Sequence, residues 1–136
     1  MIVSARFIAI VDNDRGVRSA IGRLLRAHGF RPQGYASAEA FLARGRSDDP
    51  ACLVLDVALD GMSGIDLLHQ LKADGSAIPV IVMTAADDET TRRNAVATGC
   101  IAYLQKPSSA EQLLAAIGKA TRPSANGKIN SASSAR

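Results

Sequence analysis

Polar residues suited to chemistry follow four separate apolar runs of this chain. Asp12, Asn13 and Asp14 follow the run at 7–11, Asp56 follows 52–55, Thr84 follows 79–83, and Lys106 comes shortly after 101–104. Each residue alone has an ordinary structural explanation, such as a helix cap, a turn or a solvated charge. Together they indicate one site, provided that the fold brings the ends of these runs to a common edge.

The chemistry that this set of groups favours is metal-assisted phosphoryl transfer. Neighbouring carboxylates are costly to keep ionised without a cation, and hard oxygen ligands suit Mg²⁺. The hydroxyl of Thr84 and the ammonium group of Lys106 would stabilise charge on the phosphoryl oxygens. The nucleophile must then be a carboxylate. Asp56 is the best candidate because it ends a central strand, between the acidic cluster and Thr84.

The elements that must position these groups alternate along the chain. The four apolar runs predict buried strands, and 31–35 predicts a weaker strand at an edge, because it contains Pro32 and Gly34. Helical patterns follow each strand, and Ser108 with Glu111 fits a capping box at the start of the last helix. Five such units predict an α/β fold, a doubly wound parallel sheet with helices on both faces. Ligands bind such sheets at the carboxyl ends of the strands.

The composition limits the class of protein further. The 136 residues fit one domain, 1–121, followed by a polar segment, 122–136, which we expect to be a flexible tail or linker. Three of the 16 basic residues lie in that segment, which leaves 13 basic and 13 acidic residues in 1–121. This balance argues against direct nucleic-acid binding by the domain. No apolar stretch reaches membrane-spanning length, and Cys52 and Cys100 lack metal-ligand spacing, so we expect reduced thiols and a cytoplasmic protein.

The order of these motifs resembles the receiver domain of two-component response regulators over roughly residues 5–120. The motifs that carry the resemblance are Val11-Asp12-Asn13, Leu55-Asp56, Gly64, Thr84-Ala85, Tyr103 and Lys106-Pro107. The stretch from Gly29-Phe30 to Ser37–Leu42 is similar to the FixJ-type branch in particular. The resemblance implies a five-stranded flavodoxin-like sheet with strand order 2-1-3-4-5.

The resemblance also implies a role for each site residue. Asp56 would be the phosphoacceptor, Thr84 the switch hydroxyl and Tyr103 the switch aromatic. Lys106 would pair with the phosphate, followed by a cis proline at Pro107. The implied ligands of Mg²⁺ are Asp12, Asn13, Asp56 and the backbone carbonyl of Ala58.

The same resemblance implies the partners. A histidine kinase or a phosphotransfer protein would supply the phosphoryl group. A face formed by the fourth helix, the fifth strand and the last helix would contact a downstream protein or a second copy of the chain. No membrane contact is expected, and the domain is not expected to be an enzyme beyond slow loss of its own phosphoryl group.

Four residues, in three places, depart from the family pattern. Leu59-Asp60 replaces the usual Met-Pro, and Ser108 replaces a frequent Phe. Asn13 stands where the family usually has a second metal-binding carboxylate, so Mg²⁺ affinity should fall. Asp14 is a weak substitute, because its side chain is expected to point into the start of the helix. Asn13 therefore leaves open an alternative, a pseudo-receiver that binds partners without using phosphate.

A third hypothesis is a true enzyme, a phosphatase of the haloacid-dehalogenase type. Asp12-Asn13-Asp14 after an apolar strand resembles the DxD opening of that class. The class also needs a hydroxyl soon afterwards, where this chain has Gly16, and an acidic motif after the lysine, where it has only Glu111. Steady turnover of p-nitrophenyl phosphate would support this hypothesis.

Overall fold

The computed structural model describes residues 7–44, 49–85 and 89–121, and within them strands and helices alternate strictly. The strands are β1 (Ile8–Val11), β2 (Pro32–Tyr35), β3 (Cys52–Asp56), β4 (Val80–Thr84) and β5 (Ala102–Gln105). The helices are α1 (Arg15–Ala27), α2 (Ala38–Leu42), α3 (Gly64–Ala73), α4 (Glu89–Thr98) and α5 (Ala110–Thr121). The segment 122–136 lies outside the described residues, and so does Asp87, where the helical pattern at 87–98 of the sequence predicts the start of the fourth helix.

All five strands pair in parallel in the order β2-β1-β3-β4-β5, which confirms the predicted fold class. β1, β3 and β4 are wholly buried, as their continuous apolar runs predict. β2 lies at one edge, where the missing N–H of Pro32 does no harm to the sheet.

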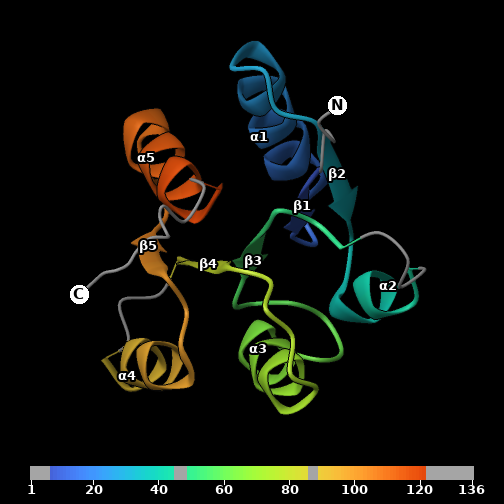
Figure 1. Cartoon of the computed structure of the whole chain (residues 1–136), viewed down its shortest axis with the longest axis vertical. Coiled ribbons are helices and arrows are strands. Elements are labelled where there is room, and N and C mark those ends of the chain that lie inside the picture. The colour runs from blue at the N-terminus through green and yellow to red at the C-terminus, as the bar shows by residue number, and fades with distance from the viewer. Residues whose placement is uncertain (1–6, 45–48, 86–88, 122–136) are drawn as a thin grey trace, which may run out of the picture.

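Helices cover both faces of the sheet, with α1 and α5 on one side and α2, α3 and α4 on the other (Figure 1). Alternate residues of each central strand point to opposite faces and form two cores. Leu53 and Leu55 of β3 pack with Phe41 and Leu67, whereas Val54 packs on the α1–α5 side.

Short polar residues begin the helices at the expected places. The Asp14 carboxylate accepts hydrogen bonds from the backbone amides of Gly16 and Val17, and the Ser37 hydroxyl caps α2. The predicted capping box of the last helix is wrong by one residue. Ser109 and Gln112 exchange the reciprocal bonds, at 3.0 and 3.3 Å, because Gln112 occupies the third helical position.

Within residues 7–44, 49–85 and 89–121, no helix is both long enough and apolar enough to cross a membrane. Both cysteines are free, and burial raises the pKa of the Cys52 thiol to about 12, so this thiol stays protonated and unreactive at neutral pH.

Candidate functional site

The carboxyl edge of the sheet collects the buried polar side chains of the molecule. Among the described residues, the polar or charged side chains that are buried are Asp12, Asp56 and Thr84, exposed by 3, 5 and 3%. Asp12 follows β1, Asp56 ends β3 and Thr84 ends β4. Thr84 lies one residue beyond Met83, the β4 partner of Asp56 in the sheet register. The parallel topology thus brings three separated sequence motifs to one place.

Lys106 joins the two acidic residues. Its Nζ atom lies 2.8 Å from Asp12 Oδ2 and 3.3 Å from Asp56 Oδ1. The backbone holds the lysine in this position, since its N–H donates to the Thr84 carbonyl at 2.7 Å and the bond to Pro107 is cis, as expected. The ammonium group therefore completes a compact cluster of two carboxylates and one cation.

The charges of this cluster favour the binding of a further cation beside the carboxylates, or of an anion at Lys106. Burial, followed by the negative charge of Asp12, raises the pKa of Asp56, although Lys106 and the Ala58 backbone amide partly counteract this. For Lys106, burial alone would lower the pKa, but the hydrogen bond to Asp12 and the charge of Asp56 outweigh it, and the pKa is raised. Lys106 is thus firmly protonated, and when both carboxyl groups are ionised they carry one more negative charge than it balances.

Asp14 does not belong to this cluster. Its carboxylate caps α1, and its backbone N–H donates to Asp12 Oδ1 at 2.8 Å. The side chain thus points into the start of the helix, as expected. A phosphatase of the DxD type needs both acids at one centre, so this arrangement argues against that hypothesis.

Only two of the four predicted metal ligands are carboxylates. Within the described residues, no group of three or more His, Cys, Asp or Glu side chains gathers as a metal site. Asp12 and Asp56 supply two carboxylates, and Asn13 is exposed beside them on the loop after β1. Oxygen donors of this kind, carboxylate plus amide, still fit Mg²⁺, which retains several water ligands in proteins.

The loop after β3 packs tightly against the site. The Ala58 backbone amide lies close to the Asp56 carboxylate, and its effect is to lower the pKa of that group. The Gly64 N–H donates to the Val57 carbonyl at 3.0 Å, and a Cβ atom at Gly64 would lie only 2.1 Å from the Asp56 carbonyl oxygen. Only glycine therefore allows α3 to start so close to the end of β3, which explains the place of Gly64 among the motifs.

Tyr103 lies on β5, opposite Val82 of β4 and two residues before the partner of Thr84. Its ring packs against the core on the α2–α3–α4 side, and its hydroxyl oxygen is buried. The predicted switch residues Thr84 and Tyr103 therefore come from adjacent strands, and Tyr103 is turned inward in this structure.

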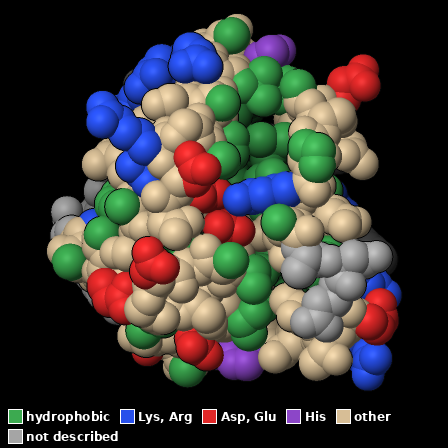
Figure 2. Space-filling model, turned by 180° about the vertical axis from the view of Figure 1, so that it is seen from behind, with side chains coloured by type: hydrophobic (Ala, Val, Ile, Leu, Met, Phe, Trp, Pro, Cys, Tyr) green, Lys and Arg blue, Asp and Glu red, His purple; other side chains and the backbone are tan. Residues whose placement is uncertain are grey.

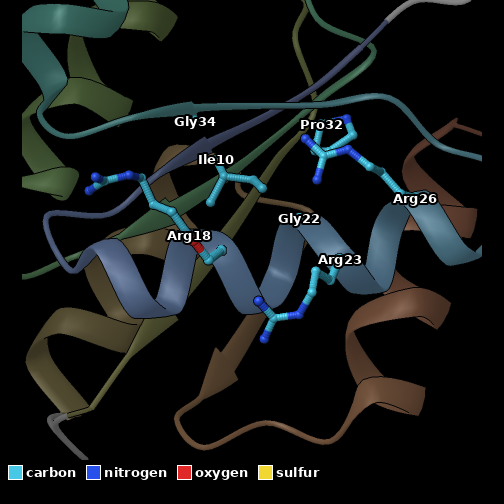
Figure 3. A pocket seen from close by; sticks show the side chains of 8 residues that line it. Ile10, Arg18, Gly22, Arg23, Arg26, Pro32 and Gly34 are labelled. Atoms are coloured by element: carbon cyan, nitrogen blue, oxygen red, sulfur yellow. The ribbon is translucent and has the colours of Figure 1, made fainter.

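Two hollows flank α1. One, of about 720 Å³, lies between α1 and α5 and is lined mainly by apolar side chains, with Lys106 at its border. Figure 2 shows a hollow lined by hydrophobic side chains, next to basic and acidic side chains. The other, of about 300 Å³, lies between α1 and β2 and contains three arginines (Figure 3). Neither hollow was predicted from the sequence, although Val17, Ile21 and Leu24 have the spacing of one apolar side of a helix.

Comparison with known proteins agrees with this geometry. The model of the response regulator receiver domain family matches residues 8–118. The transcriptional regulatory protein FixJ of Azorhizobium caulinodans is 36% identical over 110 residues, which cover 81% of this chain and 52% of FixJ. The response regulator protein TodT of Pseudomonas putida is 35% identical over 118 residues, covering 87% of this chain and 52% of TodT. The chain spans about half the length of these relatives.

Solved structures show the same fold. The crystal structure of FixJ-N superposes with a TM-score of 0.81 at 30% identity and covers 89% of this chain and 97% of its own. The response regulator StyR superposes with a TM-score of 0.80 at 36% identity, covering 92% of this chain and 63% of its own. From the order of the strands, the paired charges at their carboxyl ends and these matches, we conclude that the chain belongs to the response regulator receiver domain family.

Proposed function

We propose that this chain accepts a phosphoryl group on Asp56, from a phosphorylated histidine of a kinase or a phosphotransfer protein. The observation that carries the proposal is the contact of one lysine with two buried carboxylates, at 2.8 and 3.3 Å from Lys106 Nζ. Buried charge is costly, so a cluster that keeps an excess negative charge needs a functional reason. Receiver domains are phosphoacceptors rather than enzymes with their own substrate, and slow self-dephosphorylation is the most catalysis that we propose here.

The transfer itself follows from the groups present. A carboxylate oxygen of Asp56 attacks phosphorus, the P–N bond to the donor histidine breaks with its electron pair, and the donor imidazole becomes neutral after regaining a proton. Lys106 is placed to move from the Asp56 carboxylate to a phosphoryl oxygen while keeping its bond to Asp12. The Thr84 hydroxyl would donate a hydrogen bond to another phosphoryl oxygen. The product is an acyl phosphate on Asp56.

We propose that Asp12, Asn13, Asp56 and the Ala58 carbonyl hold Mg²⁺, on the grounds of their oxygen donors and of the excess negative charge. When bound, the ion would neutralise charge that develops on the transferred phosphoryl group. Because Asn13 contributes an uncharged amide, this affinity should be lower than with three charged ligands.

Signalling would start from the residues next to the acyl phosphate. Phosphorylation adds nearly two negative charges at Asp56. Thr84 would move toward them, and the space left behind would stabilise the inward position that Tyr103 already has in this structure. The two states of Tyr103 would then alter the face formed by α4, β5 and α5, which is our proposed contact for a downstream protein or a second copy.

The location of the apolar hollow supports a protein donor. It lies between α1 and α5 and reaches Lys106, so a helix of the donor seated there would present its histidine close to Asp56.

The free cysteines fit a reducing cytoplasm. We propose 1–121 as the receiver domain, supported by the match to 8–118 and by the end of α5 at Thr121. No direct nucleic-acid contact is proposed for this domain.

The decisive experiment is incubation with acetyl phosphate and Mg²⁺, followed by intact mass and amide NMR spectra. We expect one phosphoryl group per chain and shifts around Thr84 and Tyr103, both abolished by Asp56→Asn and by EDTA. Unchanged mass and spectra of the folded chain at millimolar Mg²⁺ would refute the phosphoacceptor proposal and leave the pseudo-receiver.

A further inference from the structure

Glu39 has no part in the site described above, yet it contacts the loop that shapes that site. We propose that Glu39 is a positioning residue for metal binding, which acts by holding the loop between β3 and α3 (57–63) against the Asp56 carboxylate. The inference rests on the proposed function, because it concerns Mg²⁺ at the same site. It adds a residue from α2, an element to which no role has been given so far.

The contact between Glu39 and the loop joins distant parts of the chain. Glu39 Oε2 accepts a hydrogen bond from the Met62 backbone N–H at 2.8 Å, across 23 positions of sequence. The Ser37 cap fixes the first turn of α2, which carries Glu39, since Ser37 Oγ accepts from the Ala40 amide at 3.0 Å. The bond from Met62 also lowers the pKa of Glu39, so the carboxylate is ionised at neutral pH. A charged acceptor on a fixed helix start therefore faces the loop.

Gly61 shows how closely the loop fits this carboxylate. Its φ angle is +76°, in the left-handed region that favours glycine. A Cβ atom there would lie 2.6 Å from Glu39 Oε2, too close for an ordinary contact. Gly61 thus allows both the turn of the loop and the approach of Glu39.

The other contacts of the loop lead directly to the site. The Val57 carbonyl accepts from the Gly64 amide at 3.0 Å, which closes the two ends of the loop on each other. The Ala58 backbone amide lies near enough to the Asp56 carboxylate to lower its pKa. Glu39 fixes the opposite part of the same loop through Met62. The path from Glu39 to the carboxylate of Asp56 therefore consists of backbone atoms of one short loop.

This arrangement predicts a specific defect when Glu39 is lost. The loop would sample more positions, so the Ala58 backbone would be in place for a smaller fraction of the time. Mg²⁺ would bind more weakly, because part of its binding energy would go into ordering the loop. Once Mg²⁺ is bound, the loop would be ordered as before, and the phosphoryl transfer would run at the normal rate.

The test compares Glu39→Ala with Glu111→Ala in the full chain. Glu111 is a matched control, because it is also an exposed glutamate in the first turn of a helix, and no hydrogen bond of its side chain is found within the described residues. Amide NMR titration with MgCl₂ gives the Kd. Mutation of groups that orient metal ligands costs about 10–100-fold in affinity, and for a solvent-exposed bond we expect about fivefold for Glu39→Ala.

Three further measurements separate positioning from a merely structural role. With acetyl phosphate, the Mg²⁺ concentration for half-maximal rate should rise in step with the Kd, whereas the maximal rate should stay unchanged. Glu39→Gln should recover part of the affinity, because its amide oxygen can still accept from Met62. Hydrogen exchange of the Met62 amide should accelerate in Glu39→Ala only.

An unchanged Mg²⁺ Kd in Glu39→Ala would overturn the proposal, as would a lower maximal rate at unchanged Kd. Equal losses in Glu111→Ala would also overturn it, because they would reflect general electrostatics. If the wild-type chain binds Mg²⁺ but takes up no phosphoryl group, the proposed function fails, and the Kd comparison still tests Glu39. No Mg²⁺ binding by the wild type at millimolar concentration would refute both.

Discussion

The charged residues at the carboxyl edge of the sheet differ from those along α1 in burial and in pairing. At the edge, Asp12 and Asp56 are buried and share the ammonium group of Lys106. Along α1, by contrast, Arg23 and Arg26 are exposed, and within the described residues they form no ion pair. Burying a charge is costly unless it is paired, whereas an exposed arginine needs no partner. Burial with pairing, rather than the number of charges, therefore marks the first region as a site.

The arrangement of the arginines supports this distinction. Five of them lie between residues 15 and 31, and no acidic residue occurs in 15–38. Figure 3 shows that the side chains of Arg18, Arg23 and Arg26 spread along the helix instead of converging on one point. Basic side chains accordingly gather on one side of the face in Figure 2. The balanced charge of residues 1–121 conceals this separation of charge within the fold.

The largest effect is expected from removing the shared cation. Lys106→Ala leaves two buried carboxylates unpaired and removes the partner of the phosphoryl oxygens, so phosphorylation by acetyl phosphate should slow by about 100-fold or more. Lys119→Ala, at an exposed lysine of α5, is the control and should keep the normal rate. A rate within threefold of wild type, as a rough threshold, for Lys106→Ala would remove the difference between the two regions.

A smaller effect is expected from adding a carboxylate beside the cluster. Asn13→Asp should raise Mg²⁺ affinity by about tenfold, because a third charged oxygen ligand joins Asp12 and Asp56. The affinity can be measured by amide NMR titration, with Gln70→Glu, which adds one negative charge at an exposed position of α3, as the control for net charge. If phosphorylation appears only in Asn13→Asp, the natural chain is a pseudo-receiver, and its buried charged side chains do not serve phosphorylation.

Physical rules explain why the sequence predicted the fold and the convergence of Asp12, Asp56 and Lys106 at one edge of the sheet. Continuous apolar runs define buried parallel strands, and the polar residue after each run must then lie at the carboxyl edge. The contact of Lys106 with both carboxylates depends on the path of the chain after β5. No local sequence pattern predicts that path. The contact of Glu39 with Met62 was missed because it joins helix α2 to a loop 23 residues further along the chain.

The dependence of stability on pH tests the burial of the Asp56 carboxyl group. The pKa of Asp56 is raised by burial and by Asp12, so the folded chain holds this proton more firmly than the unfolded chain. The free energy of unfolding therefore falls as pH rises through the window between the unfolded and the folded pKa of Asp56. In EDTA, Asp56→Asn should be more stable than wild type at neutral pH, and the difference should vanish below that window. Thermal unfolding of the two chains across this pH range measures the difference.

The smallest effect is expected on α1. Arg23→Gln removes an exposed charge with no ion pair among the described residues, so the free energy of unfolding should change by less than about 0.5 kcal/mol. Urea unfolding measures this change, and acetyl phosphate assays should give an unaltered rate, since Arg23 does not contact the acidic cluster. A loss of more than about 1 kcal/mol would mean that the guanidinium group has a structural partner. Burial and pairing would then no longer distinguish the site from the arginines of α1.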